Sequence, residues 1–251
     1  MARHDRPSAN PASTADATAA LKLDVVSDTI CPWCYVGKRR LAAALAELAG
    51  EGLAFEVTWR PFQLNPTMPK EGLDRRDYRT RKFGSWERSK ALDVQVAAAG
   101  AEDGLTFRHD LMTRTPNTLA SHALIRLAHD LGGTVMQDAV VELLFVAYFT
   151  GGRDVGDHRV LAEIGEEAGL GRANIDPFLS DAANLEAVVY DENLARGLGL
   201  NGVPSFVFDG RFLFSGAQPV TAICNMLREA AAAHLASGNV ASSKEDARVL
   251  T

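Results

Sequence analysis

Residues 21–34 read LKLDVVSDTICPWC, and this stretch decides the fold. Residues 21–27 alternate apolar and polar side chains and then turn apolar, which is typical of a sheet strand. After a short connection comes the motif Cys-Pro-Trp-Cys, and residues 35–49 then repeat apolar side chains at helical spacing. The stretch therefore predicts a strand that leads into a helix, with two cysteines at the junction.

The patterns outside this stretch predict a helical segment inserted into a sheet domain. Residues 53–59 alternate like a second strand, and a β-α-β order requires a crossover helix between parallel strands. Residues from about 74 to 197, within an insertion over 62–202, read almost entirely as helical. Strand patterns return on both sides of Asp209-Gly210, a strong hairpin signal, and a helix over 220–235 follows. The predicted class is α/β, a thioredoxin-like fold with a mixed sheet and a large inserted all-helical domain.

The domain boundaries follow from these patterns. We expect a flexible N-terminal tail over 1–20, a thioredoxin-like domain over 21–61 and 203–236, an inserted helical domain over 62–202 and a polar C-terminal tail over 237–251. The chain has 251 residues, of which 47% are hydrophobic, so it can bury a sizeable core.

Charge and hydropathy exclude several classes of partner. The net charge of −6 gives no electrostatic reason to bind nucleic acid or an anionic membrane. Residues 1–20 lack the apolar core of ~7–15 residues that a secretory signal needs. No stretch approaches the ~20 apolar residues expected of a membrane span. We therefore expect a cytoplasmic protein.

The two cysteines of the motif lie where chemistry on sulfur is favoured. A thiolate is the nucleophile in disulfide exchange, and the positive end of a helix favours it. Cys31 is therefore the expected nucleophile. Pro32 suits the first helical turn, where its missing N–H needs no partner. Cys34 is placed to attack the mixed disulfide, and Trp33 is expected to lie partly exposed over the sulfurs.

A lone C-x-x-C pair also occurs in zinc sites and in buried packing. A structural zinc site has about four ligands, and the chain offers one further cysteine, Cys224, and no histidine near the motif. No metal site is therefore expected. Cys224 itself lies among apolar residues of the final helix and is predicted to be a small buried hydrophobic residue.

Further motifs accompany the cysteine pair, in an order spread from about residue 21 to 235. They are Ser27-Asp28, Gly37-Lys38, Arg60-Pro61-Phe62-Gln63-Leu64-Asn65, Asn117-Thr118 with His122, Ala147-Tyr148-Phe149 with Gly152 and Asp154, Gly202-Val203-Pro204-Ser205-Phe206-Val207-Phe208 and Ser215-Gly216-Ala217-Gln218. With these motifs the chain resembles the DsbA-like thiol–disulfide oxidoreductases of the FrnE type over nearly its whole length.

The resemblance implies a set of roles. The helical domain would cover the active-site helix, Pro204 would be cis and face Cys31, and the Val203 backbone would pair with an extended thiol substrate. The candidate substrate-binding residues are Val203, Pro204, Asn65, Asn117, His122 and Gln218. From the residues alone, Val203-Pro204 could equally be an ordinary proline at the start of a strand.

Related families leave a second function open. The hydroxychromene-carboxylate isomerases and kappa-class glutathione transferases are similar to this chain and bind glutathione, but they carry Ser where this chain has Cys31. Gln218 stands where those relatives often carry an Asp that binds glutathione. The alternative is therefore a glutathione-dependent isomerase or transferase, and a third is a binding or chaperone module without turnover.

The expected partners are a thiol or disulfide substrate, either a protein or a small molecule. No cofactor is expected beyond the Cys31–Cys34 disulfide, with glutathione as a candidate co-substrate. A homodimer fits this type of protein, although nothing in the residues demands one. The basic residues Arg75, Arg76, Arg79, Arg81 and Lys82 are expected to form a solvated helix surface, with steering of acidic peptides as the alternative.

Overall fold

A four-stranded mixed sheet lies at the centre of the structure, a computed structural model that describes residues 20–246, with side chains to residue 237. The strand order is β2-β1-β5-β6. Strand β1 (Leu21–Ser27) pairs in parallel with β2 (Phe55–Pro61) and antiparallel with β5 (Ser205–Phe208). Strand β5 continues through the predicted hairpin into β6 (Arg211–Ser215). The predicted mixed sheet is confirmed.

The hairpin forms because Asp209 and Gly210 both adopt positive φ, 49° and 72°. A two-residue turn with positive φ at both positions matches the right-handed twist of the strands on either side. The turn brings β6 beside β5, and β5, which follows the whole helical segment, pairs with β1 at the centre of the sheet.

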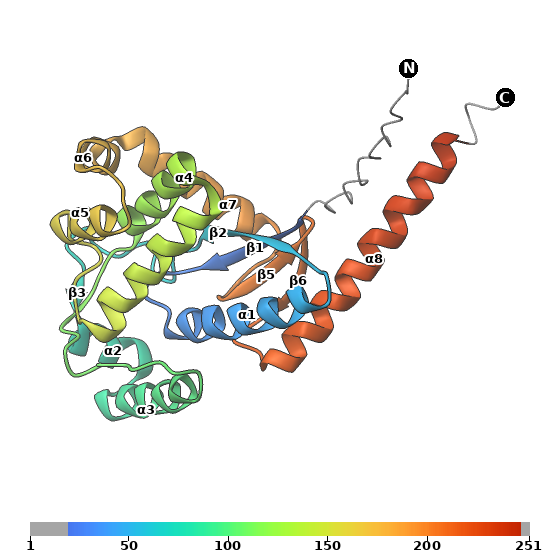
Figure 1. Ribbon diagram of the computed structural model, residues 1–251. Helices are drawn as coiled ribbons and strands as arrows, with labels where there is room; N and C mark the ends of the chain where they lie inside the picture. The colour runs from blue at the N-terminus through green and yellow to red at the C-terminus, as the bar shows by residue number, and fades with distance from the viewer. Residues whose placement is uncertain (1–19, 247–251) are drawn as a thin grey trace, which may run out of the picture.

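Two long helices pack together against the sheet. Helix α1 (Pro32–Gly50) crosses between β1 and β2, and α8 (Val220–Asp246) packs beside it. Figure 1 shows the two helices crossing near the start of α8, whose later turns extend away from the sheet. Side chains such as Leu23 of β1, Leu48 of α1 and Leu227 of α8 fill the core between them.

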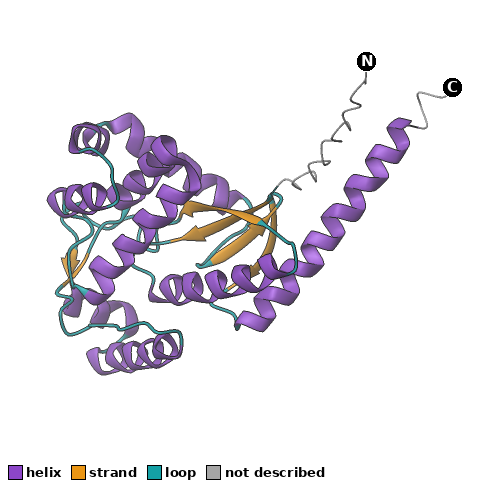
Figure 2. Ribbon diagram, viewed as in Figure 1, coloured by secondary structure: helices purple, strands orange, loops and turns teal. Residues whose placement is uncertain are grey.

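The segment between β2 and β5 is helical apart from one short pair of strands. Its helices are α2 (Arg75–Phe83), α3 (Trp86–Glu102), α4 (Leu119–Phe145), the π-helix η1 (Val146–Thr150), α5 (His158–Glu167), α6 (Arg172–Ser180) and α7 (Ala182–Gly197). Strands β3 (Leu73–Asp74) and β4 (Arg114–Thr115) pair antiparallel, so the inserted segment is not all-helical as expected. Figure 2 shows these helices gathered at one end of the central sheet.

Helix α4 connects the helical segment to the active-site helix. The ring of Tyr35 on α1 stacks on Phe145 and Phe149, with centroids 5.1 and 6.0 Å apart. Lys38 Nζ donates to Asp138 Oδ2 at 2.8 Å, and Arg39 pairs with Glu142. These contacts fix the helical segment over the first turns of α1.

The expectation that no stretch is apolar enough to span a membrane needs correction. By length and composition alone, residues Leu119–Thr150 make a helix long and apolar enough to span a bilayer, and an 18-residue window within it has a mean hydropathy of 1.3. In the fold this helix packs against β2, α5, α6 and α7, and it is kinked at Gly133, where φ is 66°. A helix packed against neighbours on several sides is apolar around much of its circumference. Core packing therefore accounts for this composition.

The C-terminal helix is longer than predicted. It was expected over 220–235, with a polar tail from 237, but α8 continues to Asp246. The added residues include no proline and several good helix formers, so polarity alone does not end the helix. The N-terminal tail predicted for 1–20 and the last five residues lie outside the described residues, except for residue 20.

Candidate active site

Cys31 lies at the junction of β1 and α1, as the sequence predicts. It is the N-cap residue of α1, with extended backbone (φ −88°, ψ 111°), and Pro32 takes the first helical position. Its N–H donates to Asp28 O at 3.0 Å, and its carbonyl accepts from the Cys34 N–H at 3.0 Å. The Cys31 side chain therefore begins beside the unpaired N–H groups and the positive end of the helix.

A buried carboxylate shapes the loop before Cys31. Asp28 is fully buried, and its Oδ2 accepts from the Leu64 N–H at 2.7 Å. Thr29 Oγ1 lies 2.8 Å from Ser121 Oγ of α4. The loop is thus attached both to the residues after β2 and to the helical segment.

Val203 and Pro204 face the first cysteine across the sheet end. The Val203-Pro204 peptide bond is cis, as the resemblance implied. The Cys31 thiol donates to Val203 O at a distance of 3.6 Å. A Cβ on Gly37 would lie 3.1 Å from the Pro204 ring, so the glycine lets α1 approach this proline closely.

All three cysteines are free thiols, so this is the dithiol form of the protein. Both thiols of the motif are buried, with Cys31 4% and Cys34 1% exposed, so Cys31 is not the exposed thiol that its place at the helix start suggests. Burial, followed by the hydrogen bond and charge of Cys31, raises the pKa of the Cys34 thiol well above its ordinary value, against weaker opposing contacts from Ser27 and Asp28. Cys34 therefore remains protonated at neutral pH.

The raised pKa of Cys34 predicts selective alkylation. Iodoacetamide reacts with thiolates, and the thiolate fraction of a thiol grows only as the pH approaches its pKa. At pH 8 the folded, reduced protein is expected to take up one equivalent, on Cys31, and three equivalents after unfolding. Cys224 is buried and burial raises its pKa as well, so it serves as the internal control. Peptide mass mapping measures this, and equal labelling of Cys34 and Cys31 would contradict it.

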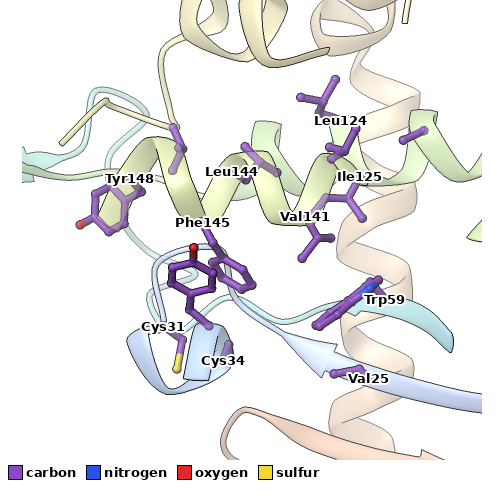
Figure 3. Close-up of a cluster of buried hydrophobic side chains, with 14 of the residues drawn as sticks. Val25, Cys31, Cys34, Trp59, Leu124, Ile125, Val141, Leu144, Phe145 and Tyr148 are labelled. Carbon is purple, nitrogen blue, oxygen red and sulfur yellow. The ribbon is translucent and has the colours of Figure 1, made fainter. Parts of the chain in front are cut away.

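A cavity of about 370 Å³ opens at Cys31. The thioredoxin-like part and the loop after β2 supply one side of it, namely Ile30, Cys31, Pro32, Trp33, Leu64, Asn65 and Val203. The helical segment supplies the other, namely Tyr78, Arg79, Lys82, Phe83, Leu92, Asp93, Gln95, Val96, Thr115 and Tyr148. Figure 3 shows Cys31 and Cys34 at the start of α1, with Tyr148 and Phe145 of the helical segment above them.

Four of the six candidate substrate-binding residues, Pro204 among them, do not line this cavity. Asn117 has a structural role, since its Nδ2 donates to Met68 O and its Oδ1 accepts from the Leu119 N–H at the start of α4. Gln218 donates to Ser215 O in its own turn. His122 is buried beside Asp28, with Nε2 3.6 Å from Oδ1. Asn65 and Val203 do line the cavity, and Pro204 adjoins Val203.

Sequence reasoning missed most of the wall that α2 and α3 contribute. Arg75, expected in solvent, is 3% exposed because its guanidinium pairs with Asp93 of α3 at 2.7 Å. Arg79 pairs with the same carboxylate at 2.8 Å. The one available signal was the run of basic residues over 75–82, which could not identify its acidic partner.

Comparison with known proteins agrees with this geometry. The chain matches the DSBA-like thioredoxin domain over residues 22–228. It is 33% identical to a probable DsbA oxidoreductase from Streptomyces coelicolor, covering 84% of this chain and 89% of that one, with a TM-score of 0.74. It is 25% identical to the cytosolic disulfide reductase DsbM from Pseudomonas aeruginosa, covering 76% and 87%, with a TM-score of 0.54. DsbM has also been solved with GSH.

A 2-hydroxychromene-2-carboxylate isomerase shares the fold. It is 18% identical, covering 88% of this chain and 98% of that one, with a TM-score of 0.59. At that identity the likeness concerns architecture and not chemistry.

Proposed function

The chain belongs to the family of DsbA-like thioredoxin domains, and on that premise we propose that it is a thiol–disulfide oxidoreductase working through Cys31 and Cys34. One observation carries the proposal. Cys31 is the N-cap residue of α1 and lines the cavity, and its thiol contacts Val203 O beside the cis Val203-Pro204 bond. Cys34 lies one turn along the same helix.

The reaction consumes one substrate disulfide and oxidises the dithiol. The Cys31 thiolate, favoured by the positive end of α1, attacks one sulfur of the substrate, and the other sulfur leaves as a thiolate that takes up a proton. Cys34 then loses its proton and attacks Cys31 Sγ. The Cys31–Cys34 disulfide forms and the second substrate thiol is released. Oxidation of a substrate dithiol is the same sequence in reverse.

The edge at Val203 supports binding of an extended substrate. In the reduced protein the Val203 carbonyl accepts the Cys31 S–H. Once Cys31 is a thiolate or a mixed disulfide it has no proton to donate, and the carbonyl becomes free to accept from a substrate N–H. The first chemical step thus exposes a main-chain acceptor beside the reacting sulfur.

Glutathione is the proposed co-substrate, and the cytoplasm the proposed location. DsbM is described as a cytosolic disulfide reductase and has been solved with GSH, which supports both. The glutathione-dependent isomerase stays the alternative function that the sequence left open, and the shared fold concerns architecture alone. The presence of Cys34 within one turn of Cys31 favours dithiol exchange, since an isomerase needs no resolving thiol.

A glutathione redox titration followed by intact mass tests the proposal. The wild-type chain is expected to lose two hydrogens as the Cys31–Cys34 disulfide forms. The Cys34→Ala variant is expected to stop at a glutathione adduct on Cys31, because nothing resolves it. Cys224→Ala is the matched control and should titrate like the wild type.

Two results would argue against this function. No internal disulfide at any glutathione ratio would exclude dithiol exchange. An isomerase activity that needs glutathione and survives the loss of Cys34 would favour the second candidate.

A further inference from the structure

The charged residues of the Cys31 cavity are unbalanced. Its lining contains two cations, Arg79 and Lys82 of α2, and one anion, Asp93 of α3. Most of the remaining lining is apolar or uncharged, such as Trp33 and Phe83. A charge on a substrate would therefore meet these three groups first.

The single anion is already neutralised. Asp93 Oδ2 accepts from Arg75 Nη2 at 2.7 Å, and Oδ1 accepts from Arg79 Nη2 at 2.8 Å. His109 lies 3.8 Å from the same carboxylate, but burial lowers the pKa of this imidazole, so it is neutral near pH 7. Two guanidinium groups, Arg75 behind the wall and Arg79 in it, thus pair with one carboxylate, and Lys82 adds a further cation, so the excess charge is positive.

Both cavity cations keep donors for another partner. Arg79 uses Nε toward Ser89 Oγ, and Nη2 toward Ser89 O and Asp93. Within residues 20–237 its Nη1 makes no hydrogen bond that meets ordinary geometry. Lys82 Nζ donates to the neutral Asn65 Oδ1 at 2.9 Å and, over the same residues, has no carboxylate within ion-pair distance.

We propose that Arg79 and Lys82 make this site selective for small disulfides that carry a carboxylate beside the S–S bond. The inference rests on the proposed function and specifies its substrate class. A cavity of about 370 Å³ is the size of a small-molecule site, and Arg79 and Lys82 line the same cavity as the attacking Cys31. A carboxylate bound there would hold the neighbouring disulfide against Cys31, as charge-assisted hydrogen bonds fix both position and affinity.

Three symmetric disulfides of similar size test the proposal. They are dithiodipropionate, which is anionic, hydroxyethyl disulfide, which is neutral, and cystamine, which is cationic. The rate of Cys31–Cys34 disulfide formation is measured by acid quench and mass, and is divided by the rate of each disulfide with dithiothreitol. This division removes intrinsic reactivity. The anionic disulfide is expected to react about fivefold faster than the neutral one, as one partly screened charge pair predicts, and the cationic one most slowly.

Two charge reversals separate the local effect from the net charge of the protein. Lys82→Glu is expected to remove the preference for the anion and to favour cystamine. Lys90→Glu makes the same change at an exposed residue of α3 outside the cavity lining, and should keep the wild-type order. Raising the ionic strength should reduce the wild-type preference, because salt screens exposed charges.

The outcomes distinguish a failure of the proposed selectivity from a failure of the proposed oxidoreductase function. Equal normalised rates for the three disulfides, or an equal change in both variants, would overturn the selectivity and leave the oxidoreductase intact. If none of the three disulfides oxidised Cys31 and Cys34, the proposed function itself would fail.

Discussion

Cys31→Ser is expected to reduce disulfide exchange by at least about 1,000-fold, because a hydroxyl at this position is not ionised and cannot form a mixed disulfide. The rest of the site stays in place. Serine is nearly isosteric with cysteine, and Cys31 contributes one long hydrogen bond, to Val203 O at 3.6 Å. The free energy of unfolding should therefore change by only about 1 kcal/mol. Turnover of hydroxyethyl disulfide, coupled to glutathione, measures the first quantity, and urea unfolding the second.

The other cysteines provide the controls for this loss. Cys224→Ser tests a buried thiol between α8 and α1, where the nearest acceptor is Glu47 Oε2 at 3.4 Å, and it should keep full activity. Cys34→Ser should still form the first mixed disulfide and then stall. If Cys31→Ser retained a tenth of the wild-type turnover, another group would have to be the nucleophile.

The parts of the fold that could be predicted are those set by local sequence. The strand Leu21–Ser27 was predicted with its exact bounds, since a period of two needs only neighbouring residues. The hairpin at Asp209-Gly210 rests on the positive φ that those two residue types tolerate. The span of α4 was also readable from local sequence, because it consists of two helical halves that meet at Gly133, where φ is 66°, and the glycine pair Gly132-Gly133 marks that break.

In the candidate site, too, some residues could be found from the sequence and others are placed only by contacts between distant parts of the chain. Cys31 and Cys34 were found from their spacing at a helix start, and Val203-Pro204 from the family resemblance. His122 could not be placed, since its burial depends on Asp28, which is 94 positions earlier in the chain but within 3.6 Å. The cationic wall was also hidden, because no local pattern tells that Asp93 of α3 pairs with arginines of α2.

The buried pairing of Asp93 with Arg75 and Arg79 predicts a large effect on the free energy of unfolding. Asp93→Ala is expected to destabilise the fold by about 3–5 kcal/mol, the usual cost of removing one partner of a buried ion pair. The side chains of Arg75 and Asp93 are 4% and 10% exposed, so water cannot replace the lost carboxylate at Arg75. Two guanidinium groups, Arg75 and Arg79, would then repel each other without a counter-ion. Urea unfolding at neutral pH, read by circular dichroism, measures the change.

Asp110→Ala is the matched control, because it removes the same side chain from another arginine pair. Asp110 and its partner Arg108 are 62% and 47% exposed, so losing this solvent-screened pair should leave the free energy of unfolding nearly unchanged. The difference between the two losses of unfolding free energy therefore measures the effect of burying the ion pair, separately from the effect of pairing the charges. If both variants lost the same stability, water would have to reach Arg75, and the wall of α2 and α3 would be looser than its packing indicates. If only Asp93→Ala is costly, the cationic wall of the Cys31 cavity is preorganised by the carboxylate that neutralises part of it.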